Sequence, residues 1–198
     1  MRSKTPLTVT VLGGIAALVL AGCNNNPGGT AGPATSTTTA ATSSAPAIAN
    51  PLDTTKLQQN LCAGLTPEQV APYMGQVKNT STDNQSKYST CNLYPTDVTQ
   101  ASVSISVYPN LSPSGMIASG KDYPYSKNLG PIQGYPAQDT SQLNPPNGDC
   151  GTAVSVSDNV VVEVSVQQAN KSSQYNNNTC AASEALAPLL LGNIKASG

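Results

Sequence analysis

Apolar and polar residues alternate along two stretches of the chain in the way that half-buried β-strands require. Residues 102–108 place an isoleucine and two valines on one face and serines on the other. Residues 160–168 place four valines on one face, and Glu163 with its odd-numbered neighbours on the other. A further valine-containing stretch, 152–156, precedes them across a turn at 157–159, so the pattern predicts a β-hairpin here.

Weaker patterns predict the rest of the sheet and its loops. Residues 88–94 and 134–140 are expected to be strands. The polar residues up to Asn84 are expected to form a loop. The stretch 109–131 is expected to be irregular, with a short helix around Met116.

Two helices are predicted at the ends of this strand-rich region. The segment 66–69 (Thr-Pro-Glu-Gln) is a helix start with a capping box, and Gly75 offers a C-terminal cap. The second helix is expected over about 180–193, with Thr179 as its N-cap and a kink at Pro188. Its predicted apolar stripe consists of Ala182, Leu186, Leu189, Leu190 and Ile194.

The order of these elements predicts an α+β fold, because strands are grouped and helices stand at the ends. We expect an antiparallel sheet of about five strands, with a short N-terminal helix and a longer C-terminal helix on one face.

The N-terminal segment reads as a lipoprotein signal. Arg2 and Lys4 precede an apolar run, 7–20, which ends in Leu20-Ala21-Gly22-Cys23. Its length of about 14 residues is short for a membrane span, which needs about 20. We therefore expect residues 1–22 to be removed and Cys23 to be lipidated.

This reading divides the chain into three parts. Residues 23–50 follow the signal peptide as the lipidated cysteine and a disordered tether of small and polar residues. Residues 51–198 form the folded domain. Two acyl chains give stable anchoring, so the expected location is the extracytoplasmic face of the cell membrane, with the membrane as a partner through Cys23.

Composition limits the chemistry. The sequence has no histidine, which excludes Ser-His-Asp and Cys-His catalysis and zinc sites built on imidazole. Its one arginine, Arg2, lies in the signal peptide, so the mature chain lacks the basic surface that nucleic-acid binding needs. The carboxylates form no recognisable pair or loop motif. We therefore expect no enzyme, no cofactor, no metal and no nucleic-acid partner.

Four cysteines remain after Cys23, and four cysteines allow three disulfide pairings. We prefer Cys62–Cys91 and Cys150–Cys180, because each bond would tie the beginning of a helix to a strand. Extracytoplasmic compartments are oxidising, and the spacing lacks the CxxC pattern of zinc sites.

Four tyrosines directly precede proline, which biases them towards extended geometry at strand ends. Tyrosine combines an apolar ring with a polar tip, which suits a groove for a glycan, lipid or peptide. The alternative is that tyrosine replaces the missing phenylalanine and tryptophan in the core. The candidate ligand contacts are Tyr108, Tyr123, Tyr125 and Tyr135.

The domain resembles the DUF3558 family of actinobacterial lipoproteins. The resemblance rests on Cys62 followed by Leu65-Thr66, Cys91-Asn92-Leu93, the segment 133–137, Cys150 before the valine-rich hairpin, Cys180-Ala181-Ala182 and Ala185-Leu186-Ala187. Leu93 replaces the expected aromatic residue, and Pro188 interrupts the final helix. The resemblance implies a secreted, lipid-anchored domain with paired cysteines. It implies no reaction, because the family is functionally uncharacterised.

Together these observations predict a lipid-anchored, non-catalytic binding module of the cell envelope, with an envelope lipid, glycan or protein as its partner. The alternatives are an accessory partner of another envelope protein without a small-molecule site, and an envelope enzyme that uses carboxylates.

Overall fold

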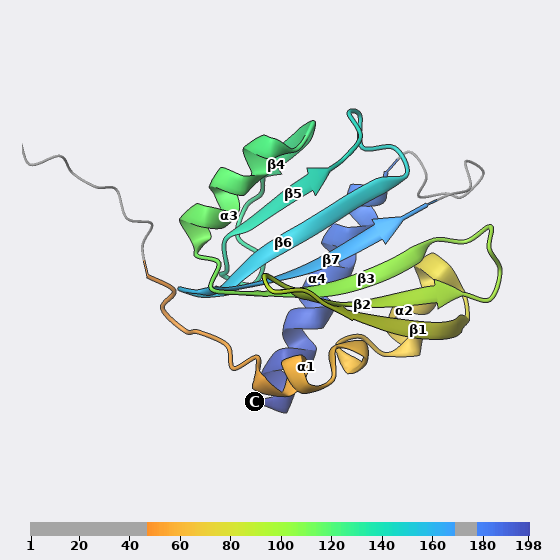
Figure 1. Cartoon of the computed structure of the whole chain (residues 1–198), viewed down its shortest axis with the longest axis horizontal. Helices are drawn as coiled ribbons and strands as arrows, with labels where there is room; N and C mark the ends of the chain where they lie inside the picture. Colours follow the sequence, from red (N-terminus) through yellow and green to blue (C-terminus); the bar gives the residue numbers. More distant parts are fainter. Residues whose placement is uncertain (1–46, 169–177) are drawn as a thin grey trace, which may run out of the picture. The chain divides into compact units, whose positions relative to one another are not determined.

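The computed structural model describes residues 47–168 and 178–198 (Figure 1). The predicted signal peptide, the predicted lipidation site Cys23, most of the predicted tether and most of the polar loop expected after Gln168 lie outside the described residues. Residues 47–50, at the end of the predicted tether, contact the domain: Ile48 packs against the main core, and its backbone N–H donates to Asp158 Oδ1 at 2.7 Å.

The centre of the domain is an antiparallel sheet of seven strands in the order β1-β2-β3-β7-β6-β5-β4. The strands are β1 (Val77–Asn84), β2 (Ser89–Pro95), β3 (Ser102–Pro109), β4 (Tyr125–Asn128), β5 (Ala137–Ser141), β6 (Asp149–Ser157) and β7 (Val160–Gln167). The antiparallel α+β fold is confirmed, but the expected number of about five strands is wrong. The predicted hairpin is present as β6 and β7.

The two additional strands are the two edges of the sheet. β1 occupies the stretch for which a loop is predicted, and β4 lies within the stretch predicted to be irregular. Seven of the eight residues of β1 are exposed, so neither face needs apolar side chains and the sequence shows no alternation. Each edge strand is held by pairing with one neighbour, β1 with β2 and β4 with β5.

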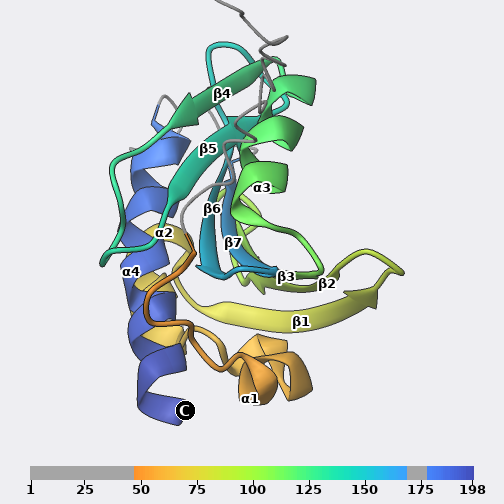
Figure 2. The same cartoon turned by 90° about the vertical axis from the view of Figure 1, so that its left-hand side faces the viewer.

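The two predicted helices, α2 (Pro67–Met74) and α4 (Thr179–Ser197), both pack on the main core and so share one face of the sheet, as expected. A third helix, α3 (Pro113–Ser119), lies at the stretch where only a short helix around Met116 is expected, and it covers the opposite face. Figure 2 shows α3 and α4 on opposite sides of the sheet. The main core lies between the inner face of the sheet and α4, with α1, η1 and α2 beside it. The helices are α1 (Thr55–Gln59), the 3₁₀ turn η1 (Leu61–Ala63), α2 (Pro67–Met74), α3 (Pro113–Ser119), the 3₁₀ turn η2 (Gly120–Asp122) and α4 (Thr179–Ser197).

The helix ends follow their capping residues. The capping box predicted at Thr66 and Gln69 is present at the start of α2. In α4, Asn178 is the N-cap in place of the predicted Thr179, since its side-chain oxygen accepts from the Ala181 backbone N–H. Leu189, predicted on the apolar stripe, is 38% exposed. Among the described residues, no helix is both long and apolar enough to cross a membrane.

Two disulfides tie the helical layer to the sheet. They join Cys62 to Cys91 and Cys150 to Cys180, which is the pairing preferred from the sequence. The first links η1 to β2, and the second links the start of β6 to the first turn of α4. Each bond therefore connects one covering element to one strand of the sheet.

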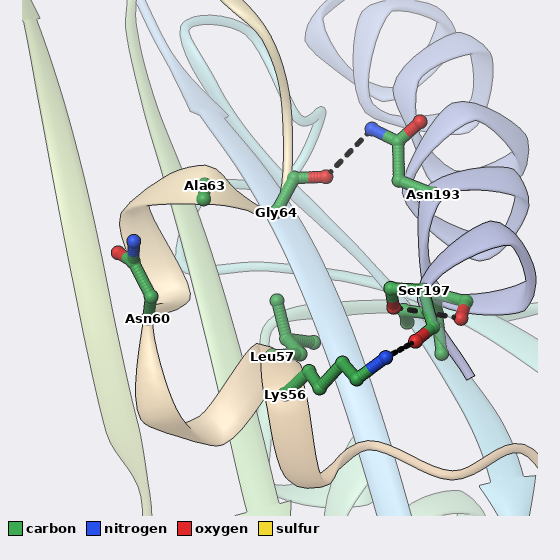
Figure 3. A pocket seen from close by; sticks show the side chains of 8 residues that line it. Lys56, Leu57, Asn60, Ala63, Gly64, Asn193 and Ser197 are labelled. Carbon is green, nitrogen blue, oxygen red and sulfur yellow. Dashed lines mark hydrogen bonds between the residues drawn. The ribbon is translucent and has the colours of Figure 1, made fainter.

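The C-terminal half of α4 rests against the N-terminal helices (Figure 3). The Asn193 side-chain amide donates to the Gly64 carbonyl at 2.9 Å and to Gln69 Oε1 at 2.8 Å. Lys56 Nζ donates to the Ser197 carbonyl, where a cation favours the negative end of the helix dipole. These contacts surround a cavity of about 150 Å³ and hold α4 in place at this end.

The close approach at Gly64 yields a first prediction. A Cβ at this position would lie 2.8 Å from Leu57 Cδ1 and 3.1 Å from Leu190 Cδ1. The new methyl group would force Leu57 and Leu190 to shift and would also crowd the Leu61 carbonyl at 3.1 Å. Because overpacking of this kind usually costs about 1–3 kcal/mol, we expect Gly64→Ala to lower the free energy of unfolding in urea denaturation, by an amount in the lower part of that range since Leu57 borders the cavity. Gly192→Ala is the matched control, since nothing lies within 4 Å of its Cβ. It should stabilise α4 by about 0.5–1 kcal/mol. Equal effects of the two changes would contradict the packing argument.

Candidate functional site

A cavity of about 180 Å³ lies beneath α3, on the outer face of the sheet, which is the face turned away from α4. It combines apolar residues from α3 and the strands with two tyrosines and one carboxylate. The lining residues are Tyr108, Leu111, Met116, Ser119, Tyr123, Gln138, Thr140, Ala153, Val161 and Glu163.

The outer face itself is mostly polar, because alternate residues of the inner strands place their hydroxyls and amides there. Strand register sets these residues in a row that crosses the middle of the sheet. From β2 to β5 the row reads Thr90, Ser106, Glu163, Ala153 and Gln138. Glu163 on the central strand β7 is the one charged side chain of this row, and α3 packs over the sheet at Ala153 of β6 and Val161 of β7.

The turn after β3 brings the two tyrosines together. Tyr108 stands at the end of β3, and Asn110 then adopts a left-handed φ of 66°, a conformation that asparagine tolerates. The Leu111 backbone N–H donates to the Asn159 carbonyl of the β6–β7 turn at 3.1 Å. The chain then enters α3, whose N-cap Ser112 accepts from the Gly115 N–H at 3.1 Å. It returns through η2, after which Tyr123 reaches the same cavity.

Glu163 is held by two hydroxyl donors. Tyr108 Oη donates to Glu163 Oε2 at 2.8 Å, and Ser165 Oγ donates to Glu163 Oε1 at 2.8 Å. Gly151 on β6 makes room for this arrangement, since a Cβ there would lie 2.1 Å from Glu163 Oε1. Any residue other than glycine at position 151 would displace the Glu163 carboxylate from this position.

The environment of both tyrosines is negative. Burial, followed by the charge of Glu163, raises the pKa of Tyr108 far above its ordinary value. Burial also raises the pKa of Tyr123, and the nearby carboxylates of Glu163, Asp149 and Asp122 raise it further. Both phenols therefore stay protonated at neutral pH, and that of Tyr108 donates to Glu163.

The structure separates the four candidate tyrosines. Tyr108 and Tyr123 line the cavity. Tyr135 belongs to the main core, where it is 6% exposed, and its hydroxyl donates to the Asn50 carbonyl at 2.7 Å. Tyr135 therefore fits the alternative prediction, in which tyrosine takes the place of phenylalanine and tryptophan in the core. Tyr125 begins the edge strand β4 and does not line this cavity.

Sequence reasoning missed Glu163, Met116 and Gln138 as members of the site. Glu163 is predicted on the outer face of its strand, which the alternation reports correctly. What the alternation does not reveal is that α3 crosses over that face and places buried Met116 beside Val161 and Ala153. The available signal was Glu163 itself, because a carboxylate in the middle of a valine-rich strand is unusual.

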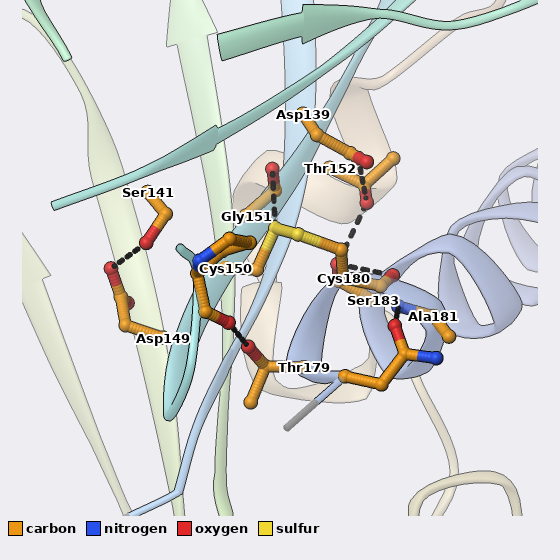
Figure 4. The surroundings of a disulfide bond; sticks show 12 residues. Asp139, Ser141, Asp149, Cys150, Gly151, Thr152, Thr179, Cys180, Ala181 and Ser183 are labelled. Carbon is orange, nitrogen blue, oxygen red and sulfur yellow. Dashed lines mark hydrogen bonds between the residues drawn. A yellow bond between two sulfur atoms is a disulfide. The ribbon is translucent and has the colours of Figure 1, made fainter. Parts of the chain in front are cut away.

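A second polar cluster lies under the first turns of α4 (Figure 4). Asp139 on β5 is completely buried, and its Oδ1 accepts from Thr152 Oγ1 at 2.8 Å. Thr152 Oγ1 in turn lies 2.8 Å from Ser183 Oγ of α4. The sulfurs of Cys150 and Cys180 lie within 4.8 Å of the Asp139 carboxylate, but the disulfide occupies both of them. In this form of the protein they are not free to ligate a metal.

Asp139 and Glu184 form a carboxyl pair that the sequence pattern does not reveal. Asp139 Oδ2 is buried with no hydrogen-bond partner in the structure. Burial and the adjacent Glu184 carboxyl raise the pKa of Asp139 to about 7, although Thr152 and Lys127 act in the opposite direction. A proton on Asp139 would satisfy Oδ2 by bonding to Glu184. Asp139 is closed off from solvent, whereas Glu184 is partly exposed.

Comparison with known proteins identifies a family but no individual relative. A family model described as "Protein of unknown function (DUF3558)" matches residues 18–193. No curated protein and no solved structure matches the chain. The family match spans every described helix and strand up to most of α4, which confirms the resemblance found in the cysteine-centred motifs. The chain therefore belongs to the DUF3558 family.

Proposed function

We propose that this protein is a lipid-anchored, non-catalytic binding module on the extracytoplasmic face of the cell membrane, held there through Cys23. The observation that carries the binding function is the cavity beneath α3. Two Tyr-Pro segments separated in sequence, at Tyr108 and Tyr123, meet there around the Glu163 carboxylate. Binding pockets are typically concave and mainly apolar, with a few placed polar groups, and this cavity has that make-up.

Three features support a binding role over a catalytic one. The sequence has no histidine, and the Asp139 carboxyl is buried away from solvent. Glu163 has no second carboxylate among the residues that line its cavity, so the two-carboxylate arrangement of a glycosidase is not formed there.

The test is native mass spectrometry of the full chain, extracted from its own membranes in a mild detergent. We expect a reproducible additional mass on the wild-type protein. Ala153→Leu should abolish this mass, because Ala153 forms part of the cavity floor and the larger side chain would fill the space.

Ala196→Leu, at an exposed position in the last turn of α4, makes the same substitution away from the cavity and should retain the mass. A wild-type protein that carries no additional mass, or one whose mass survives Ala153→Leu, would contradict the proposed site. Co-purification of a protein in place of a small molecule would favour the accessory-partner alternative.

A further inference from the structure

We infer that the cavity beneath α3 takes an organic ammonium ion, that is, a positively charged nitrogen joined to a small apolar body, with the nitrogen at Glu163. This inference rests on the proposed binding function and specifies its ligand class. It draws on the partners of Glu163, the aromatic rings around it and the apolar part of the lining.

The charge of Glu163 has no counterion among the described residues. Its hydrogen-bond partners are the hydroxyls of Tyr108 and Ser165, both neutral. A carboxylate offers about four acceptor positions, so about two remain after these bonds. A partly buried carboxylate without an opposite charge is a costly arrangement, and a bound cation would remove that cost. An anionic ligand would meet repulsion from the same group.

Aromatic rings stand on the same side of the sheet. Tyr108 and Tyr123 line the cavity, and the ring of Tyr88 lies 5.4 Å from that of Tyr108 between centroids. Tyrosine ring faces attract an ammonium group within about 6 Å, and the attraction grows when the group is desolvated. The Asp149 and Asp122 carboxylates act on Tyr123 in addition to Glu163, so the local potential favours a cation.

The remainder of the lining calls for an apolar body. Met116 and Val161 are buried and form a small cluster with Ala153, and Leu111 packs against it. The volume of about 180 Å³ slightly exceeds the roughly 150 Å³ of an engineered apolar cavity that binds benzene. A six-membered ring with one ammonium-bearing carbon is therefore of suitable size. A sugar would leave many hydroxyls against Met116, Val161 and Leu111 without partners.

The probe pair is benzylamine, protonated at neutral pH, and benzyl alcohol, which has nearly the same shape without the charge. Isothermal titration into the full chain should show saturable binding of benzylamine, with affinity at least about tenfold above that of benzyl alcohol. In Glu163→Gln, which keeps the size of the side chain and an acceptor for Tyr108, the two probes should bind with equal affinity.

Controls separate the cavity from the detergent and from misfolding. Ala153→Leu, titrated in the same detergent, should bind neither probe, whereas Ala196→Leu should bind like the wild type. A thermal unfolding scan of Glu163→Gln verifies that the variant is folded. Partitioning of benzylamine into micelles would appear equally in all variants and is subtracted by this comparison.

The outcomes distinguish the ligand class from the binding function. If both probes bind the wild type equally, or if Glu163→Gln keeps the preference for benzylamine, the ammonium inference is overturned while the cavity remains a binding site. If neither probe binds, the ammonium inference is overturned for a ligand of this size. The native mass spectrum then decides whether the proposed function falls as well.

Discussion

Replacing Cys150 and Cys180 by alanine is expected to lower the free energy of unfolding by about 3–4 kcal/mol or more. The bond closes a loop with a sequence separation of 30 residues, and closing a loop of that length restricts the unfolded chain by about that amount. The bond also holds the first turn of α4 against β6. There Ser183 completes the polar cluster with Thr152 and buried Asp139, so the loss should exceed the loop contribution.

The other disulfide supplies a matched comparison. Cys62–Cys91 closes a loop with a sequence separation of 29 residues, so the chain-entropy contribution of the two bonds should be nearly equal. Urea denaturation of the two double-alanine variants, measured on the full chain, therefore gives the difference between the local contributions of the two bonds. Equal losses would show that the turn at Ser183 keeps its place without the bond. A loss below about 1 kcal/mol in both would contradict the loop-closure account.

Asp139→Asn is expected to stabilise the protein above neutral pH by a few kcal/mol. Burial and Glu184 raise the pKa of Asp139 from 3.8 to about 7, so the folded protein binds a proton that the unfolded chain releases at lower pH. The wild type should therefore lose stability as the pH rises from about 4 through 7, where Asp139 must become charged in a buried place. Asparagine stays neutral, accepts from Thr152 and donates to Glu184.

The measurement is the free energy of unfolding of both proteins at a series of pH values between 4 and 8. The decline over this window should be much smaller in Asp139→Asn. Glu184→Gln is the companion variant: since burial is the larger cause of the shift, it should reduce the decline without abolishing it. If Asp139→Asn is less stable than the wild type at pH 8, the Asp139 carboxylate is charged and well solvated there, against our expectation.

The central strands were predictable because one of their faces is buried, which produces alternating apolar and polar residues in the sequence. The valines of β7 and the aliphatic residues of β3 alternate, and those of the inner face are almost fully buried. The edge strand β1 shows no such alternation, since its residues face solvent on both sides and only the backbone pairing with β2 makes it a strand. Turn chemistry located the capping box of α2 but missed the N-cap of α4 by one residue, because Asn178 and Thr179 are both good caps.

The candidate site could be predicted only in part. The Tyr-Pro dipeptides drew attention to Tyr108 and Tyr123, but the same pattern also selected Tyr135, which the main core holds. What distinguishes them is the path of α3 across the outer face, set by the turn at Asn110 and by the contact between Leu111 and the β6–β7 turn. Such long-range placement has no signature in a local window, and the meeting of Asp139 with Glu184 is missed for the same reason.

If the proposed lipid anchor at Cys23 holds the protein to the membrane, the polar edges of the sheet also bear on how many copies can share that membrane. Anchored proteins are confined to two dimensions, where their local concentration is high and unpaired strand edges of neighbours meet often. β1 presents serine, threonine and asparagine with Lys78, and β4 presents Lys127, and an edge lysine discourages edge-to-edge aggregation. Crowded copies are therefore expected to remain separate molecules, each with its cavity beneath α3 open to ligand.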